Sequence, residues 1–245
     1  MSRLNLFFKK CFAAAGLEVS RRQVRTAATG KRSLLADQGI ELLLDVGANI
    51  GQYATRVREE GYAGRIVSFE PLKEAHAELV LKARLDPGWT VHERCAIGAA
   101  IGEAEINVSK NSVSSSLLPM LAAHTQAAPD SVYVDKNLTK VLTLDAVMGQ
   151  YRRARERVFL KIDTQGFERE VLEGAQESLK FVVGLQLELS IVPLYASQEL
   201  YRWFLDDLEQ RGFVLWSLVP GHVDPGTGQM VQFDGVFIRR EHAAH

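Results

Sequence analysis

The sequence Leu42-Leu-Leu-Asp-Val-Gly-Ala-Asn-Ile-Gly51 predicts a buried strand that runs into a ligand-binding turn. Three leucines and a valine suit a parallel strand that is covered on both faces. Gly47 and Gly51 lie where the backbone bends tightly and can approach a ligand closely. A second strand is expected at residues 65–69, with Glu70 at its carboxyl end. An acid at that position can accept hydrogen bonds from both hydroxyls of a ribose.

Strands and helices alternate on both sides of this stretch, which favours an α/β fold with a parallel sheet. Residues 158–162 and 182–189 are predicted to be buried strands, and residues 213–219 and 230–238 a terminal antiparallel hairpin. A further strand is expected at residues 89–93, and helices at residues 52–60, 73–85, 147–155, 167–172, 175–181 and 195–210. Ligands of such sheets bind at the carboxyl ends of the strands.

The chain of 245 residues is long enough for one α/β domain, and its charge is distributed unevenly. Residues 1–35 contain eight Lys or Arg and a single acid, whereas the remainder is acidic. We therefore predict a basic helical amino-terminal extension at residues 1–39 and one domain at residues 40–245. Only two cysteines, Cys11 and Cys95, are present, which indicates a reducing compartment, the cytoplasm.

The amino-terminal extension has one further feature, a set of apolar residues at helical spacing. The apolar residues share one face and the basic residues lie elsewhere on the turn, as in helices that lie on a membrane surface. The apolar residues are Leu4, Phe7, Phe8, Cys11 and Phe12, and the basic residues are Arg3, Lys9 and Lys10. No apolar run approaches the roughly 18 residues of a spanning helix. A weak peripheral membrane contact through this basic arm is thus the alternative to a purely cytoplasmic protein.

Two cofactor-binding patterns compete for the first turn. The dinucleotide pattern Gly-x-Gly-x-x-Gly matches only at Gly47, so a nicotinamide-dependent oxidoreductase is the weaker alternative. The acid-x-Gly-x-Gly-x-Gly pattern of class I methyltransferases matches at Asp45, Gly47, Asn49 and Gly51, with Asn as the residue most tolerant of positive φ after glycine. Asp45 would then hold the amino-acid part of S-adenosylmethionine, directly or through water. The seven expected strands with their terminal hairpin agree with this Rossmann-like class I methyltransferase fold.

A second polar cluster follows the strand at residues 158–162. Lys161 interrupts that apolar strand, which is costly unless its ammonium group is paired or lines a cavity. Asp163 lies two positions further, on the same face of the strand. Glu188 lies near the end of the next strand, and Glu168 in the first turn of the next helix, where an acid also complements the helix dipole.

The loops between these strands are harder to interpret. Residues 95–98 are expected to close the strand at residues 89–93, so that Ala96 and Ile97 flank a bound base. Residues 103–109 alternate as a half-exposed strand does, and the polar residues 111–116 have the composition of a surface turn. Residues 122–137 are weakly patterned, and we expect a mobile cover over the site.

Many short motifs together resemble the FkbM-type methyltransferases over residues 42–238. The resemblance implies S-adenosylmethionine-dependent methylation of a hydroxyl on a sugar, glycan or natural product. Gln165 and Phe167 occupy positions that vary in the family. The matching motifs are Asp45-Val-Gly-Ala-Asn-Ile-Gly51, Phe69-Glu-Pro71, Ala96-Ile-Gly98, Ser114-Ser-Ser-Leu117, Thr143-Leu-Asp145, Lys161-Ile-Asp-Thr-Gln-Gly-Phe-Glu168, Glu173-Gly-Ala175 and Leu187-Glu188.

The chemistry of methyl transfer, in which the acceptor hydroxyl must be aligned and deprotonated, suggests roles for residues in and between these motifs. The catalytic group would be Asp163, as base or orienting group for the acceptor, with Lys161 and Glu188 beside it. An alternative role for Asp163 and Glu188 is to ligate a hard divalent cation such as magnesium. Residues expected to bind the cofactor are Asp45, Gly47, Ala48, Asn49, Gly51, Glu70, Pro71, Ala96, Ile97 and Asp163. Residues expected near the substrate are Ser115, Ser116, His124 and Glu168.

The predicted partner is a small-molecule or glycan acceptor rather than a nucleic acid. An Asn/Asp-Pro-Pro-aromatic motif, typical of amino-group methylation of nucleic acid, is replaced by Asp163-Thr-Gln-Gly166. The acidic body also argues against a large phosphate-binding surface. A non-catalytic binding protein that keeps the cofactor fold is a further alternative, against which the intact Lys161, Asp163 and Glu188 argue.

Overall fold

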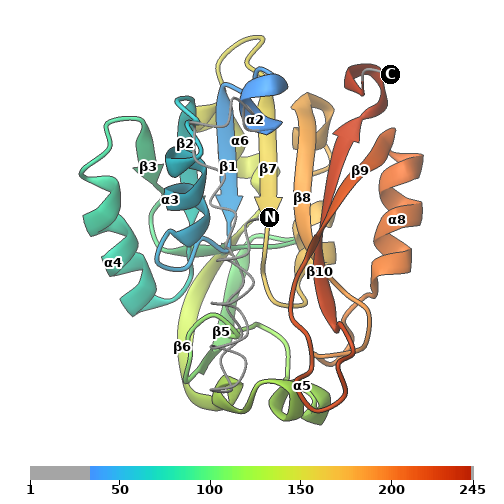
Figure 1. Cartoon of the computed structure of the whole chain (residues 1–245). Coiled ribbons are helices and arrows are strands. Elements are labelled where there is room, and N and C mark those ends of the chain that lie inside the picture. Colours follow the sequence, from blue (N-terminus) through green and yellow to red (C-terminus); the bar gives the residue numbers. More distant parts are fainter. Residues whose placement is uncertain (1–33, 244–245) are drawn as a thin grey trace, which may run out of the picture. The chain divides into compact units, whose positions relative to one another are not determined.

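The computed structural model describes residues 34–243, which form a seven-stranded sheet between two layers of helices (Figure 1). The basic arm at residues 1–33 lies outside the described residues, so its helical character and its membrane contact stay predictions. Within the described residues, no helix is both long and apolar enough to cross a membrane.

The strand order of the main sheet is β3-β2-β1-β7-β8-β10-β9. All neighbouring strands are parallel except β10, which is antiparallel to both β8 and β9. The predicted class I methyltransferase sheet with its terminal hairpin is therefore confirmed. The strands are β1 (Leu42–Val46), β2 (Arg65–Phe69), β3 (Trp89–Val91), β7 (Val158–Ile162), β8 (Val182–Ser190), β9 (Phe213–Pro220) and β10 (Gln232–Arg239).

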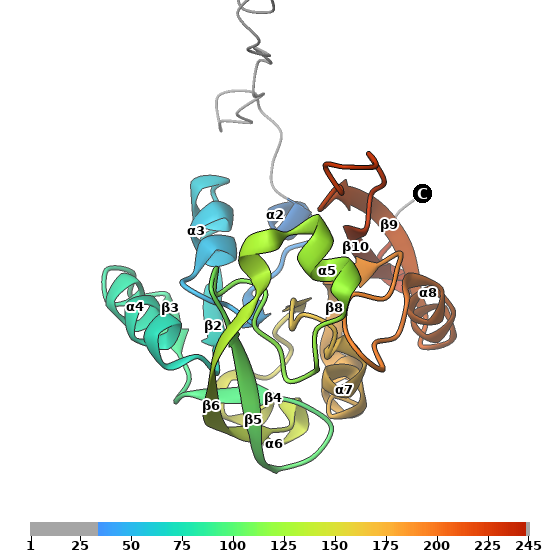
Figure 2. The same cartoon turned by 90° about the horizontal axis from the view of Figure 1, so that it is seen from below.

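Each face of the sheet has its own hydrophobic core, because successive side chains of a strand point to opposite faces. Leu42 and Leu44 belong to the core shared with α6, α7 and α8, whereas Leu43 belongs to the core shared with α2, α3 and α4. Figure 2 shows α3 on one side of the sheet and α6 and α7 on the other. The helices are α2 (Leu34–Asp37), α3 (Gln52–Glu59), α4 (Lys73–Ala83), α6 (Leu144–Tyr151), α7 (Glu168–Glu173) and α8 (Tyr201–Gln210).

A second sheet of three strands, in the order β4-β6-β5, was not predicted. Its strands are β4 (Cys95–Ile97), β5 (Gly102–Ser109) and β6 (Tyr133–Leu142). In Figure 1, β5 and β6 lie below the arrowheads of β1 and β7. The expectation that residues 95–98 close β3 was wrong, because β4 pairs with β6 instead.

The expected cover at residues 122–137 is also more regular than the sequence suggested. It consists of α5 (Ala122–Ala127), a short 3-10 helix (Pro129–Ser131) and the first half of β6. Most side chains in that half of β6 are exposed, so the strand lacks the apolar alternation by which a half-buried strand is recognised.

Three predicted helices have different limits in the structure. The helix expected at residues 195–210 begins only at Tyr201, because Leu194 and Tyr195 are buried in a separate small core. The helix expected at residues 147–155 is α6, which begins earlier because the Thr143 side chain accepts a hydrogen bond from the Ala146 N–H. Of residues 175–181, only Ser178–Phe181 is helical, as a 3-10 turn.

Candidate active site

A cavity of about 350 Å³ lies at the carboxyl ends of β1, β2 and β7, where ligands of α/β sheets bind. This volume is within the range of small-molecule sites. Its lining comes from segments that are far apart in the sequence: Val46–Asn49, Gln52, Tyr53, Arg56, Phe69–Leu72, Cys95–Ile97, Ile106, Ser112, Val113, Ser115, Leu117, Lys161, Asp163–Gln165, Phe167, Gln186 and Asp234.

The turn after β1 has the backbone conformation that the glycine pattern predicts. Gly47, Asn49 and Gly51 have φ angles of 75°, 47° and 84°, so Asn49 occupies the left-handed region where a glycine stands in the common pattern. A Cβ on Gly47 would lie 1.8 Å from the carbonyl oxygen of Asp163. The turns after β1 and β7 therefore touch through backbone atoms, and only glycine fits at residue 47.

Glu70 binds two backbone N–H groups of the cavity wall beside this turn. One carboxylate oxygen accepts a hydrogen bond from the Asn49 N–H at 2.7 Å, and the other accepts one from the Leu72 N–H at 2.7 Å. Glu70 is only 3% exposed, and this burial raises its pKa to about 7. Each oxygen keeps a second acceptor position, so the predicted bonds to ribose hydroxyls remain compatible with the structure.

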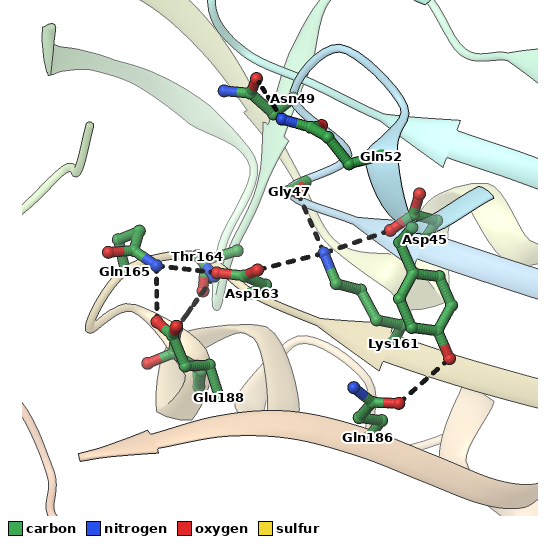
Figure 3. Close-up of polar contacts among 12 residues, drawn as sticks. Asp45, Gly47, Asn49, Gln52, Lys161, Asp163, Thr164, Gln165, Gln186 and Glu188 are labelled. Carbon is green, nitrogen blue, oxygen red and sulfur yellow. Dashed lines mark hydrogen bonds and ion pairs between the residues drawn. The ribbon is translucent and has the colours of Figure 1, made fainter. Parts of the chain in front are cut away.

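Lys161 lies at the centre of the site and is both buried and paired (Figure 3). Its Nζ is 3.3 Å from Asp45 Oδ1 and 3.4 Å from Asp163 Oδ2, and it donates a hydrogen bond to the Gly47 carbonyl at 3.1 Å. Burial alone would lower the pKa of Lys161, but the charges of Asp163 and Asp45 raise it above its ordinary value. The lysine is therefore a fixed cation that joins the two turns.

Asp45 lies behind the cavity lining and is fully buried. Its Oδ2 accepts a weak hydrogen bond from Ser68 Oγ at 3.5 Å, and its other oxygen meets Lys161. Burial raises the pKa of Asp45, and Lys161 opposes this rise. Asp45 thus reaches the cavity through Lys161, and its direct contact with a cofactor stays a prediction. Gly51 also lies outside the lining, whereas Ala48, Pro71, Ala96 and Ile97 belong to it.

Gln165 joins Asp163 to Glu188, a role that sequence reasoning missed. Its Nε2 donates to Asp163 Oδ1 at 2.8 Å and to Glu188 Oε2 at 2.5 Å (Figure 3). Its Oε1 accepts a hydrogen bond from the Tyr195 hydroxyl at 2.8 Å. Gln165 has a φ of 56°, an uncommon conformation for a non-glycine residue. Burial and then the charge of Asp163 raise the pKa of Glu188 well above its ordinary value.

This arrangement does not fit the alternative in which Asp163 and Glu188 ligate magnesium. The amide nitrogen of Gln165 occupies the position between the two carboxylates that a shared cation would need. Within residues 34–243, no group of three or more His, Cys, Asp or Glu side chains is arranged to hold a metal ion. We therefore derive no step that requires a metal.

Glu168 is turned away from the cavity and holds the loop after β7. One of its oxygens accepts hydrogen bonds from the N–H groups of Thr164 at 2.9 Å and Gly166 at 3.2 Å. Because Glu168 is 1% exposed, burial raises its pKa to about 7. These contacts give Glu168 a structural role at the start of α7, and its predicted contact with substrate is not part of the observed geometry.

The three other residues expected near the substrate lie in different places. Ser115 belongs to the cavity lining, and its Oγ accepts a hydrogen bond from the Ser109 N–H at 2.9 Å. Ser116 lies outside the lining and donates to the Gln165 carbonyl at 2.6 Å. His124 is buried against the ring of Tyr195, with ring centroids 5.0 Å apart, and burial lowers its pKa to about 4. His124 therefore lies behind the site, away from the lining.

The lining residues that were not predicted include Tyr53 and Arg56 on α3, Gln186 on β8 and Asp234 on β10. The Tyr53 hydroxyl donates to Gln186 Oε1 at 3.1 Å, and Lys161 Nζ lies 5.6 Å from the centroid of the Tyr53 ring. Gln186 and Asp234 each interrupt an apolar strand, which is the same signal that drew attention to Lys161. Sequence reasoning could have found both by applying that signal to every strand.

Comparison with known proteins assigns a family to this fold and site. The sequence matches the family model described as "Methyltransferase FkbM domain" over residues 45–215. No curated protein matches the sequence.

Three solved structures with a similar chain trace share little sequence identity with this chain. Methyltransferase FkbM from Methylobacillus flagellatus KT has 17% identity and a TM-score of 0.46, and the alignment covers 80% of this chain and 43% of that protein. Our chain thus spans less than half the length of that structure. A methyltransferase dependent on S-adenosylmethionine from Aquifex aeolicus has 14% identity and a TM-score of 0.42, with 84% and 87% covered. Fibrillarin from Aeropyrum pernix with bound S-adenosylmethionine has 9% identity and a TM-score of 0.46, with 87% and 72% covered.

The family match, unlike these distant structural likenesses, identifies the protein's class. It covers more than half of the chain and includes the glycine turn, Glu70, Lys161, Asp163 and Glu188. The nicotinamide alternative has no comparable support. The chain belongs to the FkbM family of methyltransferases.

Proposed function

We propose that the protein methylates a hydroxyl group of a sugar, glycan or other natural product. The observation that supports this most is the position of Asp163. Its side chain is 35% exposed beside the cavity, while Lys161 and Gln165 hold its two oxygens. A carboxylate in this position can accept the proton that a hydroxyl must lose to become a good nucleophile.

The cavity has two ends with different tasks in this proposal. The cofactor end, formed by Gly47–Asn49, Glu70 and Ala96, would bind S-adenosylmethionine, with Glu70 on its ribose. The acceptor end, formed by Lys161, Asp163 and the residues around Tyr53, would bind the hydroxyl. Bound S-adenosylmethionine supplies an activated methyl group, so the reaction needs mainly alignment and proton removal by the protein.

Asp163 is the proposed base for the acceptor. It would accept the hydroxyl proton while the methyl group passes to the acceptor oxygen, with the S–C bond of S-adenosylmethionine breaking to leave S-adenosylhomocysteine. Lys161 would keep the carboxylate charged before that transfer, and Gln165 would keep it turned towards the cavity. The residues present thus account for orientation and proton transfer without a metal.

The charged groups at the acceptor end balance, which supports a neutral acceptor rather than a nucleic acid. Asp163 and Asp234 line the cavity there together with Arg56 and Lys161. A phosphate backbone is bound by clusters of Lys and Arg, and this lining offers none. A contact of the basic arm with a membrane or an acidic partner stays a separate proposal.

The function is tested by calorimetry with S-adenosylmethionine and S-adenosylhomocysteine, followed by transfer of a labelled methyl group to a panel of sugars, glycolipids and polyketides. We expect both nucleotides to bind and the label to appear on oxygen of at least one acceptor. Absence of binding would contradict the cofactor assignment. Label found only on nitrogen or carbon of the acceptor would contradict methylation of a hydroxyl.

A further inference from the structure

Residues of α3, β8 and β10 that no sequence motif identified form one part of the cavity lining, which we call the mouth. Arg56, Gln186 and Asp234 line this mouth, together with Tyr53. Tyr53 and Arg56 lie three residues apart on α3, so one helix face presents both to the cavity. In the antiparallel pair of β10 with β8, Asp234 is opposite Glu188.

Contacts among these residues leave their charged groups available to a ligand. The guanidinium of Arg56 lies 4.9 Å from the centroid of the Tyr53 ring, and the Tyr53 hydroxyl donates to Gln186 Oε1 at 3.1 Å. Burial raises the pKa of Asp234, and the nearby Gln186 side chain opposes this rise. Neither Arg56 nor Asp234 forms an ion pair with any residue in the described part of the chain.

The charges of the mouth favour a neutral ligand with several hydroxyls. Lys161 is already paired with Asp45 and Asp163, so it offers little attraction to an anion. A phosphate or carboxylate near Arg56 would also meet the negative charges of Asp163 and Asp234. A hydroxyl both donates and accepts, so neighbouring hydroxyls can bond Asp234 and Arg56 at the same time.

We infer that Arg56, Gln186 and Asp234 form the acceptor subsite and hold a neutral polyhydroxylated ring, such as a sugar, by hydroxyls next to the one presented to Asp163. This inference rests on the proposed function of the cavity and narrows it to one acceptor class. Asp234 and Gln186 bind ring hydroxyls, and Arg56 donates to a hydroxyl or ether oxygen at the outer edge.

The test is a saturation-transfer NMR titration of the full chain with bound S-adenosylhomocysteine. The probes are methyl glycosides of glucose, galactose, mannose and rhamnose, with glucose 6-phosphate and glucuronate as matched anions. We expect at least one neutral glycoside to bind more tightly than both anions. Its affinity should fall about tenfold or more in Asp234→Asn and in Arg56→Gln, because each loses a hydrogen bond to a charged group.

Exposed positions elsewhere supply matched controls. Asp206→Asn on α8 and Arg84→Gln at the end of α4 make the same chemical changes, and we expect wild-type affinity in both. Calorimetry with S-adenosylhomocysteine shows whether each variant keeps the cofactor end intact.

Three outcomes would overturn the subsite: preference for the anions, unchanged affinity in the two mouth variants, or no binding of any neutral glycoside. Other outcomes test the proposed function separately from the subsite. If a glycoside binds through Arg56 and Asp234 but its hydroxyls are never methylated, the subsite stands and the reaction is wrong. If a hydroxyl is methylated equally well by both mouth variants, the reaction stands and the subsite is wrong.

Discussion

The two ends of the cavity are held in place by different kinds of contact. At the cofactor end, the N–H groups of Asn49 and Leu72 bind Glu70, and Gly47 touches the backbone of Asp163. At the acceptor end, side chains from several elements bind one another, with Gln165 between Asp163 and Glu188. The first end tolerates little change in its backbone, whereas the second can be altered one side chain at a time.

This difference predicts which substitutions disturb the fold and which disturb only the reaction. Changes to the backbone turn should unfold the cofactor end and abolish binding of S-adenosylmethionine. Changes to the side chains of the acceptor end should leave that binding intact. Three substitutions test the comparison, from the largest expected effect to the smallest.

Gly47→Ala should have the largest effect, because its Cβ would overlap the Asp163 carbonyl. We expect a loss of unfolding free energy of about 4 kcal/mol or more, and no detectable binding of S-adenosylmethionine. Gly61→Ala is the control, because Gly61 also has a positive φ of 88° but no atom within 4 Å of its built Cβ. That control should lose about 1 kcal/mol through backbone strain alone. Equal losses in both variants, measured by denaturant unfolding, would show that the contact between the turns is unimportant.

Glu168→Gln should change the pH dependence of stability. The pKa of buried Glu168 is raised to about 7 from an ordinary value of 4.5. The folded state therefore binds this proton more tightly than the unfolded state does. The resulting stabilisation of the fold is fully present below about pH 4.5 and is lost as the pH rises through 7. Gln stays neutral and keeps an oxygen that can accept from Thr164 and Gly166. The unfolding free energy of the Glu168→Gln variant, relative to that of the wild type, should therefore rise by about 2 kcal/mol between about pH 4.5 and pH 7.5.

Urea unfolding at several pH values measures this difference. Glu60→Gln, at an exposed position after α3, is the control and should show a difference that does not vary with pH. A constant difference for Glu168→Gln as well would mean that the folded protein does not hold this carboxyl in its neutral form.

Gln165→Met should have the smallest effect on the fold and a clear effect on the reaction. Met fills similar space but cannot donate to Asp163 or Glu188. We expect kcat to fall about tenfold, with unchanged affinity for S-adenosylmethionine. Gln210→Met at the exposed end of α8 is the control. Loss of cofactor affinity in Gln165→Met would show that the two ends are not independent.

The same comparison explains how much of the site could be predicted from the sequence. The cofactor end depends on local backbone conformation, which leaves a local pattern: glycines, an Asn at positive φ, and an acid after the next strand. Glu70 was recognised for this reason, whereas Lys161 was recognised because it interrupts an apolar strand. Apart from Lys161 and Asp163, the acceptor end is assembled by the fold from α3, β8 and β10, so no short stretch contains its pattern, and Gln165 was taken for a variable position.

The fold shows a similar division. The main sheet was predicted because β1, β7 and β8 are buried and mostly apolar. The second sheet was missed because β6 is largely exposed and β4 has only three residues. Their pairing is decided by tertiary contacts rather than by hydrophobic periodicity.

The most direct test of the account compares cofactor affinity and turnover in one variant, Asp163→Asn. Asn can still accept a hydrogen bond from Gln165, but it cannot take a proton from a hydroxyl. We predict that kcat for methyl transfer falls by about 10²–10⁴ while calorimetry gives an unchanged affinity for S-adenosylmethionine. Wild-type turnover in this variant, with the cofactor still bound, would contradict the role of Asp163 as the base.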